Sequence, residues 1–374
     1  MVVTSIAGSH FEVSALPLSG VDALNPAFEH TKAQLFRPFR FGQWTRLAFV
    51  GLFAGEMSSG GGCNFNVPAH TGDTQRHYLM SAPQDWTFLI PLIIVAIIAV
   101  PILWLVVLYI SSRMRFVLFD SVVAKNCEIG RMWRNRGGPA LQLFVWQIVF
   151  SLITLAGLAL LIGVPALAAF LLGWFTDPRA HLAPLILSGI ALFFVLMAWF
   201  LGIVTVHVFT KDFVVPQMAL ENVSAFEGWR RLWTMLMAEK GGYAGYAGMK
   251  LVMAIGAAFV LAMAAIVVVI ILLIPFGGLG VITVLAGKAA GMGLSWNVFT
   301  ITAAIVFGTI FLLLLFYALA LVSVPAIVFF PAYSIYFFAD RYRQLGSLIR
   351  PPAPQPHPLP PPPPPIAPAP EPIG

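Results

Sequence analysis

The sequence predicts an all-α polytopic membrane protein: a bundle of about six transmembrane helices, with amphipathic interfacial helices in a parallel internal repeat. Of the 374 residues, 59% are hydrophobic and only 10% are charged, and the mean hydropathy is +0.89. Soluble domains average about 45–50% apolar and about 25% charged residues. Long apolar stretches recur along the chain, separated by connecting segments. Basic residues concentrate in every second connecting segment. A soluble globular domain is excluded, because too few charges are present to cover its surface.

Four stretches are long enough to cross the bilayer, since about 20 apolar residues in a helix span its hydrocarbon core. They are residues 87–110, 141–173, 183–209 and 249–276. A fifth stretch, 298–338, is longer than one crossing needs, and we expect Pro325 and Pro331 to kink or end it. The segment 43–57 is short, and it is either a sixth span or a re-entrant segment.

Loop charges favour six crossings with both termini in the cytoplasm. If 43–57 crosses, all but three of the 21 Lys and Arg residues lie on one side, the exceptions being Arg76, Arg179 and Lys288. If it does not cross, four more basic residues join those three. Because lysine and arginine concentrate in cytoplasmic loops, the first arrangement is preferred. We therefore expect a multi-pass protein of the cell membrane, and we attribute the net charge of +6 to topology rather than to nucleic-acid binding.

The chain divides into three parts on this interpretation. Residues 1–24 form an N-terminal cytoplasmic arm, 25–345 the six-span membrane domain, and 346–374 a Pro-rich disordered tail. Residues 351–374 contain 14 prolines, which favours polyproline II and cannot form a core. A solvated extension is the simpler interpretation of the tail, and binding to a partner's aromatic groove is the alternative.

Two inside loops resemble each other. Residues 116–138 read FVLFDSVVAKNCEIGRMWRNRGG, and residues 213–242 read FVVPQMALENVSAFEGWRRLWTMLMAEKGG. Both open with Phe-Val, carry Trp and Arg together and end in two glycines before an apolar span. We interpret them as parallel repeats, each an interfacial helix followed by two spans, with the helices near 26–40, 116–136 and 213–240. The competing interpretation is that basic, aromatic inside loops are common in membrane proteins.

Local signals predict helices in these segments. Ser224 and Glu227 have capping-box spacing, and Gly241 fits the residue that stops a helix. In the first segment four apolar residues share one helix face: Phe28, Leu35, Phe36 and Phe39.

Arginine and tryptophan side chains of the inside segments are the candidate contacts for lipid headgroups or a cytoplasmic partner. They are Arg37, Arg40, Trp44, Arg46, Arg131, Trp133, Arg134, Trp229, Arg230, Arg231 and Trp233. Arginine can bridge lipid phosphates, and aromatic rings insert at headgroup depth. The lipid bilayer, with anionic lipids in particular, is thus the expected partner. Ordinary anchoring by an aromatic belt is the more common role of such residues.

Polar residues of the spans offer a second candidate site. Gln142, Gln147, Thr302, Thr309 and Tyr317 would line a cavity between the third and sixth spans, or would hydrogen-bond between helices, which is the commoner role. Ionisable groups are rare in the spans; Lys211 and Asp212 lie at a span end, with His207 one turn earlier. This scarcity argues against a proton-coupled pump.

Catalytic and metal sites are weakly indicated. His70, Asp73 and His77 have a spacing that could hold a metal ion on one helix face, but Gly72 and the polar context disfavour a helix there. Cys63 and Cys127 fall on opposite sides of the membrane, which excludes a disulfide between them. Neither a GxSxG elbow nor an HExxH motif is present. We expect no catalytic residues and no cofactor.

The segments FRPFRFGQW, FVLFDSV and SAFEGWRRLW resemble a group of uncharacterised prokaryotic multi-pass membrane proteins. That group is similar to the membrane domain attached to some glycerophosphoryl diester phosphodiesterases. The resemblance covers most of residues 25–345 and implies a fold and a location. It carries no catalytic residue across, because the phosphodiesterase's soluble catalytic barrel has no counterpart here.

Three functions fit these observations. The preferred one is a membrane scaffold or lipid-interacting module without chemistry of its own. The alternatives are a transporter or channel with a path between the repeats, and a membrane enzyme that acts on lipids through the loop 58–86.

Overall fold

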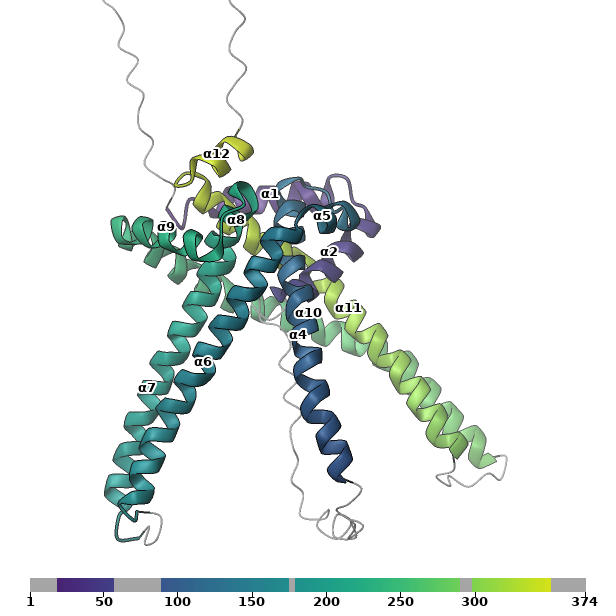
Figure 1. The fold of residues 1–374 in the computed structure, drawn as a ribbon. Helices are drawn as coiled ribbons and strands as arrows, with labels where there is room; N and C mark the ends of the chain where they lie inside the picture. Colours follow the sequence, from purple (N-terminus) through teal and green to yellow (C-terminus); the bar gives the residue numbers. More distant parts are fainter. Residues whose placement is uncertain (1–18, 57–88, 175–178, 290–297, 351–374) are drawn as a thin grey trace, which may run out of the picture.

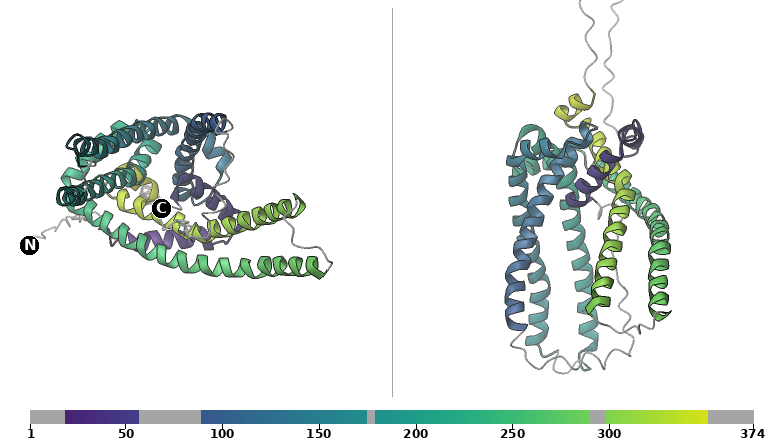
Figure 2. Two further views of the ribbon diagram at one scale, coloured as in Figure 1. Left: turned by 90° about the horizontal axis from the view of Figure 1, so that it is seen from below. Right: turned by 90° about the vertical axis from the view of Figure 1, so that its right-hand side faces the viewer.

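Five long apolar helices extend in one direction from a common cap (Figure 1). The computed structural model describes residues 19–56, 89–174, 179–289 and 298–350, which are helical and contain no strand. The long helices are α4 (Leu89–Val123), α6 (Gly137–Leu171), α7 (Leu182–Phe209), α10 (Lys240–Ala289) and α11 (Val298–Ala339). Each is long and apolar enough to cross a membrane. They form three arms, α4, α6 with α7, and α10 with α11, which diverge away from the cap (Figure 2).

The cap consists of short helices and the ends of the long helices that reach them. The short helices are α1 (Leu24–Phe36), α2 (Phe41–Ala54), α5 (Ile129–Asn135), α8 (Val215–Glu221), α9 (Ala225–Ala238) and α12 (Arg343–Ile349). A five-residue π-helix, η3 (Thr210–Val214), joins α7 to α8. Both ends of the described chain lie at the cap (Figure 1).

The hydrophobic core lies in the cap, where α4, η3, α8 and α11 end side by side. Its fully buried side chains include Phe116, Val117 and Val122 of α4, Phe213 and Met218 of η3 and α8, and Tyr333, Phe337 and Phe338 of α11. The Phe213 ring contacts the rings of Tyr246, Phe337 and Phe338, with centroids 5.0–6.0 Å apart. Aromatic packing therefore joins three chain segments that are far apart in sequence.

The arms contribute little to this core. In the most apolar 18-residue stretches of α4, α6, α7 and α10 no residue is buried, and in α11 17% are. Lipid tails are as apolar as leucine, so apolar side chains can face lipid without a penalty. Packing is concentrated in the cap for this reason.

The predicted sixth span at 43–57 has no helix of spanning length among the described residues. Helix α2 has 14 residues, about 21 Å at 1.5 Å per residue, which falls short of a core about 30 Å thick. Helix α2 lies in the cap, and α4 begins at the far end of its arm (Figure 1). Residues 57–88, which connect the two helices, lie outside the described ranges, and a sixth crossing stays a prediction.

Pro325 and Pro331 do not end the helix, because α11 continues through both to Ala339, so of the two predicted outcomes only a kink is left. Helices α4, α6 and α10 likewise contain Pro101, Pro165 and Pro275. Proline is tolerated in membrane helices, where neighbouring groups satisfy the freed carbonyls.

The interfacial segments differ from their predicted form. Residues 116–123 are the buried end of α4, and 213–221 form the buried η3 and α8, so neither lies on a surface. These segments are mostly apolar, and their buried polar side chains, Ser121 and Gln217, donate to carbonyls one turn earlier, so both segments can enter the core. Helix α9 does match the prediction at its start, where the Ser224 hydroxyl accepts from the Glu227 N–H at 3.2 Å. Gly241 lies inside α10 and does not stop α9.

Two of the repeated loops nevertheless follow the same path. Lys125 and Asn222 each stand nine residues after the Phe that opens their loop, and both adopt left-handed backbone, with φ of 53° and 56°. Such a residue ends a helix by turning the chain out of its axis. A short helix, α5 or α9, then leads into α6 or α10. This likeness is what an internal repeat would produce, and the duplication itself stays a prediction.

Candidate functional site: a buried ionic cluster beneath the cap

Five charged side chains lie where the arms meet the cap, four of them buried and the fifth, Lys211, nearly so, and we call them the ionic cluster. They are Glu56, just after α2; Arg115 of α4; Lys211 and Asp212 of η3; and Lys250 of α10. The most exposed side chains of the cluster are those of Lys211 and Lys250, and each is 11% exposed. Charged groups this deep are expensive unless they are paired.

Two ion pairs account for four of these groups. The Lys211 ammonium contacts the Glu56 carboxylate, and the Lys250 Nζ lies 2.5 Å from Asp212 Oδ2. The same Asp212 oxygen accepts a hydrogen bond from the Tyr246 hydroxyl at 2.9 Å. The π-helix η3 thus directs two adjacent residues to different partners, one after α2 and one on α10.

Arg115 contacts neutral acceptors instead. Its Nε donates to the Ala54 carbonyl oxygen at 3.3 Å, and its Nη2 lies 3.2 Å from His207 Nε2, which accepts because a guanidinium only donates. With His207 neutral, three cations stand against two carboxylates. Counted over these five residues of the described chain, the ionic cluster carries one positive charge in excess.

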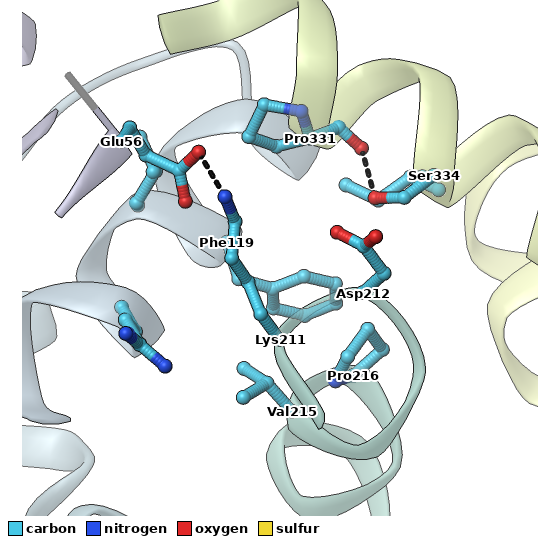
Figure 3. A pocket seen from close by; sticks show the side chains of 11 residues that line it. Glu56, Phe119, Lys211, Asp212, Val215, Pro216, Pro331 and Ser334 are labelled. Carbon is cyan, nitrogen blue, oxygen red and sulfur yellow. Dashed lines mark hydrogen bonds and ion pairs between the residues drawn. The ribbon is translucent and has the colours of Figure 1, made fainter. Parts of the chain in front are cut away.

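A small cavity of about 30 Å³ lies against the ionic cluster (Figure 3). Figure 3 shows Lys211 reaching toward Glu56, while Asp212 points toward Ser334 of α11. The polar lining is Glu56, Arg115, Lys211, Asp212 and Ser334; the apolar lining is Leu118, Phe119, Val215, Pro216, Pro331 and Ile335. One water needs about 10–15 Å³ by this measure, so the cavity accommodates about two water-sized groups.

The candidate headgroup contacts divide into two sets. Three tryptophans stabilise the cap: Trp44 Nε1 donates to the Leu35 carbonyl at 3.1 Å, Trp229 Nε1 to the Thr210 hydroxyl at 3.0 Å, and the Trp133 ring lies 4.9 Å from the Arg113 guanidinium. The exposed set is Arg37, Arg40, Arg46, Arg131, Arg134, Arg230 and Trp233. Arg231 lies between the two sets, since it pairs with Glu221 at 2.5 Å and with Glu227 at 2.9 Å.

These contacts shift two pKa values on α9. Hydrogen bonds from Arg231 and Arg230 hold the pKa of the Glu227 carboxyl below its usual value. Hydrogen bonds to Glu221 and Glu227 raise the pKa of Arg231. Arg231 therefore remains charged but is already engaged with carboxylates.

Of the five polar residues predicted to line a path, Gln147 and Tyr317 contact a neighbouring helix. Ser112 of α4 donates to Gln147 of α6 at 2.7 Å, and the Tyr317 hydroxyl of α11 lies 3.2 Å from that of Thr45 in α2. Thr309 donates to the Ile305 carbonyl of its own helix. Gln142 and Thr302 are exposed. None of the five lines the cavity described above, and a common path between the third and sixth spans stays a prediction.

Burial among apolar side chains also shifts the pKa values of two groups in the cap. Burial lowers the pKa of His30, whose Nε2–H donates to the Val122 carbonyl at 2.9 Å. Burial raises the pKa of the Cys127 thiol.

The metal candidates His70, Asp73 and His77, and the other cysteine, Cys63, lie outside the described ranges. Within those ranges no group of three or more His, Cys, Asp or Glu side chains is arranged to hold a metal ion.

Sequence reasoning located only part of the ionic cluster. It placed Lys211, Asp212 and His207 at a span end and missed Glu56, Arg115 and Lys250. The scarcity of charge that it reported holds along the arms but not at their cap ends. The signal that could have indicated the cluster is that acidic and basic residues stand at the cap ends of helices from separate repeats.

Comparison with known proteins gives one match. The model of the Family of unknown function (DUF7544) matches residues 18–348. No curated protein and no solved structure matches the chain, so the similarity to phosphodiesterase membrane domains finds no support among relatives. The five apolar helices of this chain agree with a membrane protein. Since the match covers most of the sequence, the chain belongs to this family of unknown function.

Proposed function

We propose that the protein is an integral-membrane scaffold that binds lipid around and between its arms, without chemistry of its own. The observation that carries this proposal is the apolar exposure of the spans on nearly every face. On α7, for example, Phe193, Phe194 and Phe200 are 58–65% exposed. A water-exposed patch of this size would drive aggregation, whereas acyl chains cover it without cost.

The charge distribution supports a cytoplasmic position for the cap. Arg37, Arg40 and Arg46 are exposed around the turn between α1 and α2, beside the exposed rings of Phe39 and Phe41. Basic residues concentrate on the cytoplasmic side, and interleaved arginine and aromatic side chains suit the surface of an anionic leaflet. On this proposal the cap rests at the inner leaflet of the cell membrane, with both termini in the cytoplasm.

Oxygen accessibility of spin labels placed one at a time along α7 tests the proposal. Labels at Phe193, Phe194, Val195, Met197 and Phe200 should all show high accessibility to lipid-dissolved oxygen. Only the narrow stripe of Leu192, Leu196 and Trp199 should be partly shielded, because these half-buried residues face α6, where the Trp199 ring packs on Gly157. A label at exposed Lys32 in the cap is the control, and it should respond to a water-soluble reagent instead. A second shielded stripe on α7 would mean that protein, not lipid, covers the arm.

A transporter or channel remains the second candidate, and the ionic cluster is the observation that favours it. Intramembrane ionisable groups commonly mark substrate or ion paths. Flux measurements on proteoliposomes test this function: a solute leak that Asp212→Asn abolishes while the variant remains folded in the vesicles would support it.

A further inference from the structure

We propose that the ionic cluster binds a single phosphate group of charge −1, supplied by the phosphodiester of an anionic lipid. Arg115 is the residue that contacts it. This proposal rests on the proposed function, since it names the lipid chemistry that the scaffold would hold at its centre.

Charge balance is the first argument. Each carboxylate of the ionic cluster already has a lysine partner, Glu56 with Lys211 and Asp212 with Lys250. Among the described residues, the hydrogen bonds of Arg115 go to the Ala54 carbonyl and the His207 ring, which are neutral, although Glu56 and Asp212 act on its charge without a direct ion pair. A buried cation without an ion-pair partner of its own is costly. One monoanion beside Arg115 would bring the net charge of the cluster to zero.

The chemistry of the cavity is the second argument. Arg115 lines it, and a guanidinium presents paired N–H groups that match two oxygens of one phosphate. The volume of about 30 Å³ admits only two oxygen-sized groups, so the two non-bridging oxygens of a phosphodiester would enter it and the rest of the group would stay at its mouth. Ser334 also lines the cavity, and its hydroxyl donates to the Pro331 carbonyl at 2.8 Å.

The carboxylates set the limit on the ligand's charge. Glu56 and Asp212 also line the cavity, and like charges close together disfavour each other. A dianion would meet both carboxylates with only one excess cation to offset it. The site therefore selects a monoanion.

The depth of the cavity points to lipid as the source. Arg115 lies near the cap end of α4, and Lys211 immediately follows α7. With the apolar arms in the hydrocarbon core, these residues stand at the level of one leaflet's headgroups. A lipid lying between the arms would bring its phosphate to this level.

Thermal unfolding of the purified, delipidated full chain tests the proposal. The wild type is titrated with short-chain phosphatidylglycerol, with phosphatidylcholine and with inorganic phosphate. We expect phosphatidylglycerol to raise the unfolding midpoint in a saturable manner. In Arg115→Gln the half-saturating concentration should rise about 10–100-fold, the loss expected for a charge-assisted hydrogen-bonded contact.

Arg113→Gln is the matched control, since Arg113 lies two residues earlier on α4, contacts Tyr109 and Trp133 and does not line the cavity. It should respond as the wild type does. Arg115→Lys keeps the charge and should retain a weakened response, which preserves the test if Arg115→Gln does not fold.

The outcomes separate the sources and the two proposals. A response to inorganic phosphate that Arg115→Gln loses supports the site and makes free phosphate its source. An absence of any anion response in the wild type, or an Arg115→Gln response equal to wild type, overturns the site. If the phosphate site is overturned while the oxygen-accessibility measurement still shows lipid covering the arms, the scaffold proposal stands without the phosphate site.

Discussion

Lys211 and Asp212 are neighbours in η3, yet their side chains form ion pairs with different parts of the protein. Lys211 contacts Glu56 at the end of the N-terminal pair of helices, and Asp212 contacts Lys250 on the arm of α10 and α11. A π-helix widens the turn, and such turns are frequent at functional sites. The η3 segment follows the arm of α6 and α7. It therefore links this arm through Lys211 to the end of α2 and through Asp212 to the arm of α10 and α11.

Removing one partner of the Asp212–Lys250 pair should destabilise the protein strongly. Asp212→Asn leaves the Lys250 ammonium buried without its counter-charge, and such a loss typically costs about 3–5 kcal/mol. Unfolding of the detergent-solubilised protein measures the effect. The control is Glu29→Gln, which removes the exposed Glu29–Lys32 pair and should change stability by less than about 1 kcal/mol.

The double variant Asp212→Asn, Lys250→Met should recover part of the stability that Asp212→Asn loses. It removes both charges and so leaves no uncompensated cation at this position. A double variant as unstable as the sum of the single changes would show that the two groups do not interact.

Stability should fall as the pH is lowered below about 6.5, through His30. Burial holds the pKa of His30 below its ordinary value of 6.5, so the unfolded chain takes up a proton that the folded cap excludes. The contribution of neutral His30 is complete above the unfolded pKa and is lost as the pH falls. Unfolding midpoints between pH 8 and pH 5 measure this loss.

His30→Gln should flatten that pH dependence, because glutamine does not titrate. The glutamine amide can still donate toward the Val122 carbonyl, which accepts from His30 Nε2 at 2.9 Å. An unchanged slope in His30→Gln would assign the pH dependence to another group.

The contact between α2 and α11 should be sensitive to one methyl group at Gly51. A Cβ at this position would come within 2.5 Å of the Ile327 side chain, and overpacking of this kind costs about 1–3 kcal/mol. Gly51→Ala should therefore lower the unfolding midpoint. Gly42→Ala in the same helix is the control, since a Cβ there has no neighbour within 4 Å, and it should leave stability equal or slightly higher.

The sequence allowed the membrane class and the five long helices to be predicted, because a span depends only on local apolar content. The contacts of the ionic cluster could not be predicted in this way. Glu56 and Lys211 are separated by 155 positions and Asp212 and Lys250 by 38, and each residue by itself is indistinguishable from an ordinary loop charge.

The burial of the segments predicted as interfacial helices could not be predicted either, but for a different reason. Phe116 and Phe213 were interpreted as openings of surface helices, but both are fully buried in the cap core. Phe28, Phe36 and Phe39 share a predicted apolar face with Leu35, yet only Leu35 is buried. Hydrophobic periodicity does not tell whether an apolar face contacts protein or lipid, and here the two occur side by side.

The central claim is that the cap holds the arms apart while lipid separates them. Its most direct test is the distance between spin labels at Leu187 of α7 and Leu285 of α10, measured in lipid nanodiscs. A pair at Leu167 and Leu187, within the hairpin of α6 and α7, serves as the reference for packed helices. We predict that Leu187 and Leu285 give a much longer distance than the reference pair, whereas helix axes within about 8–10 Å of each other, and hence similar distances for both pairs, would contradict the account.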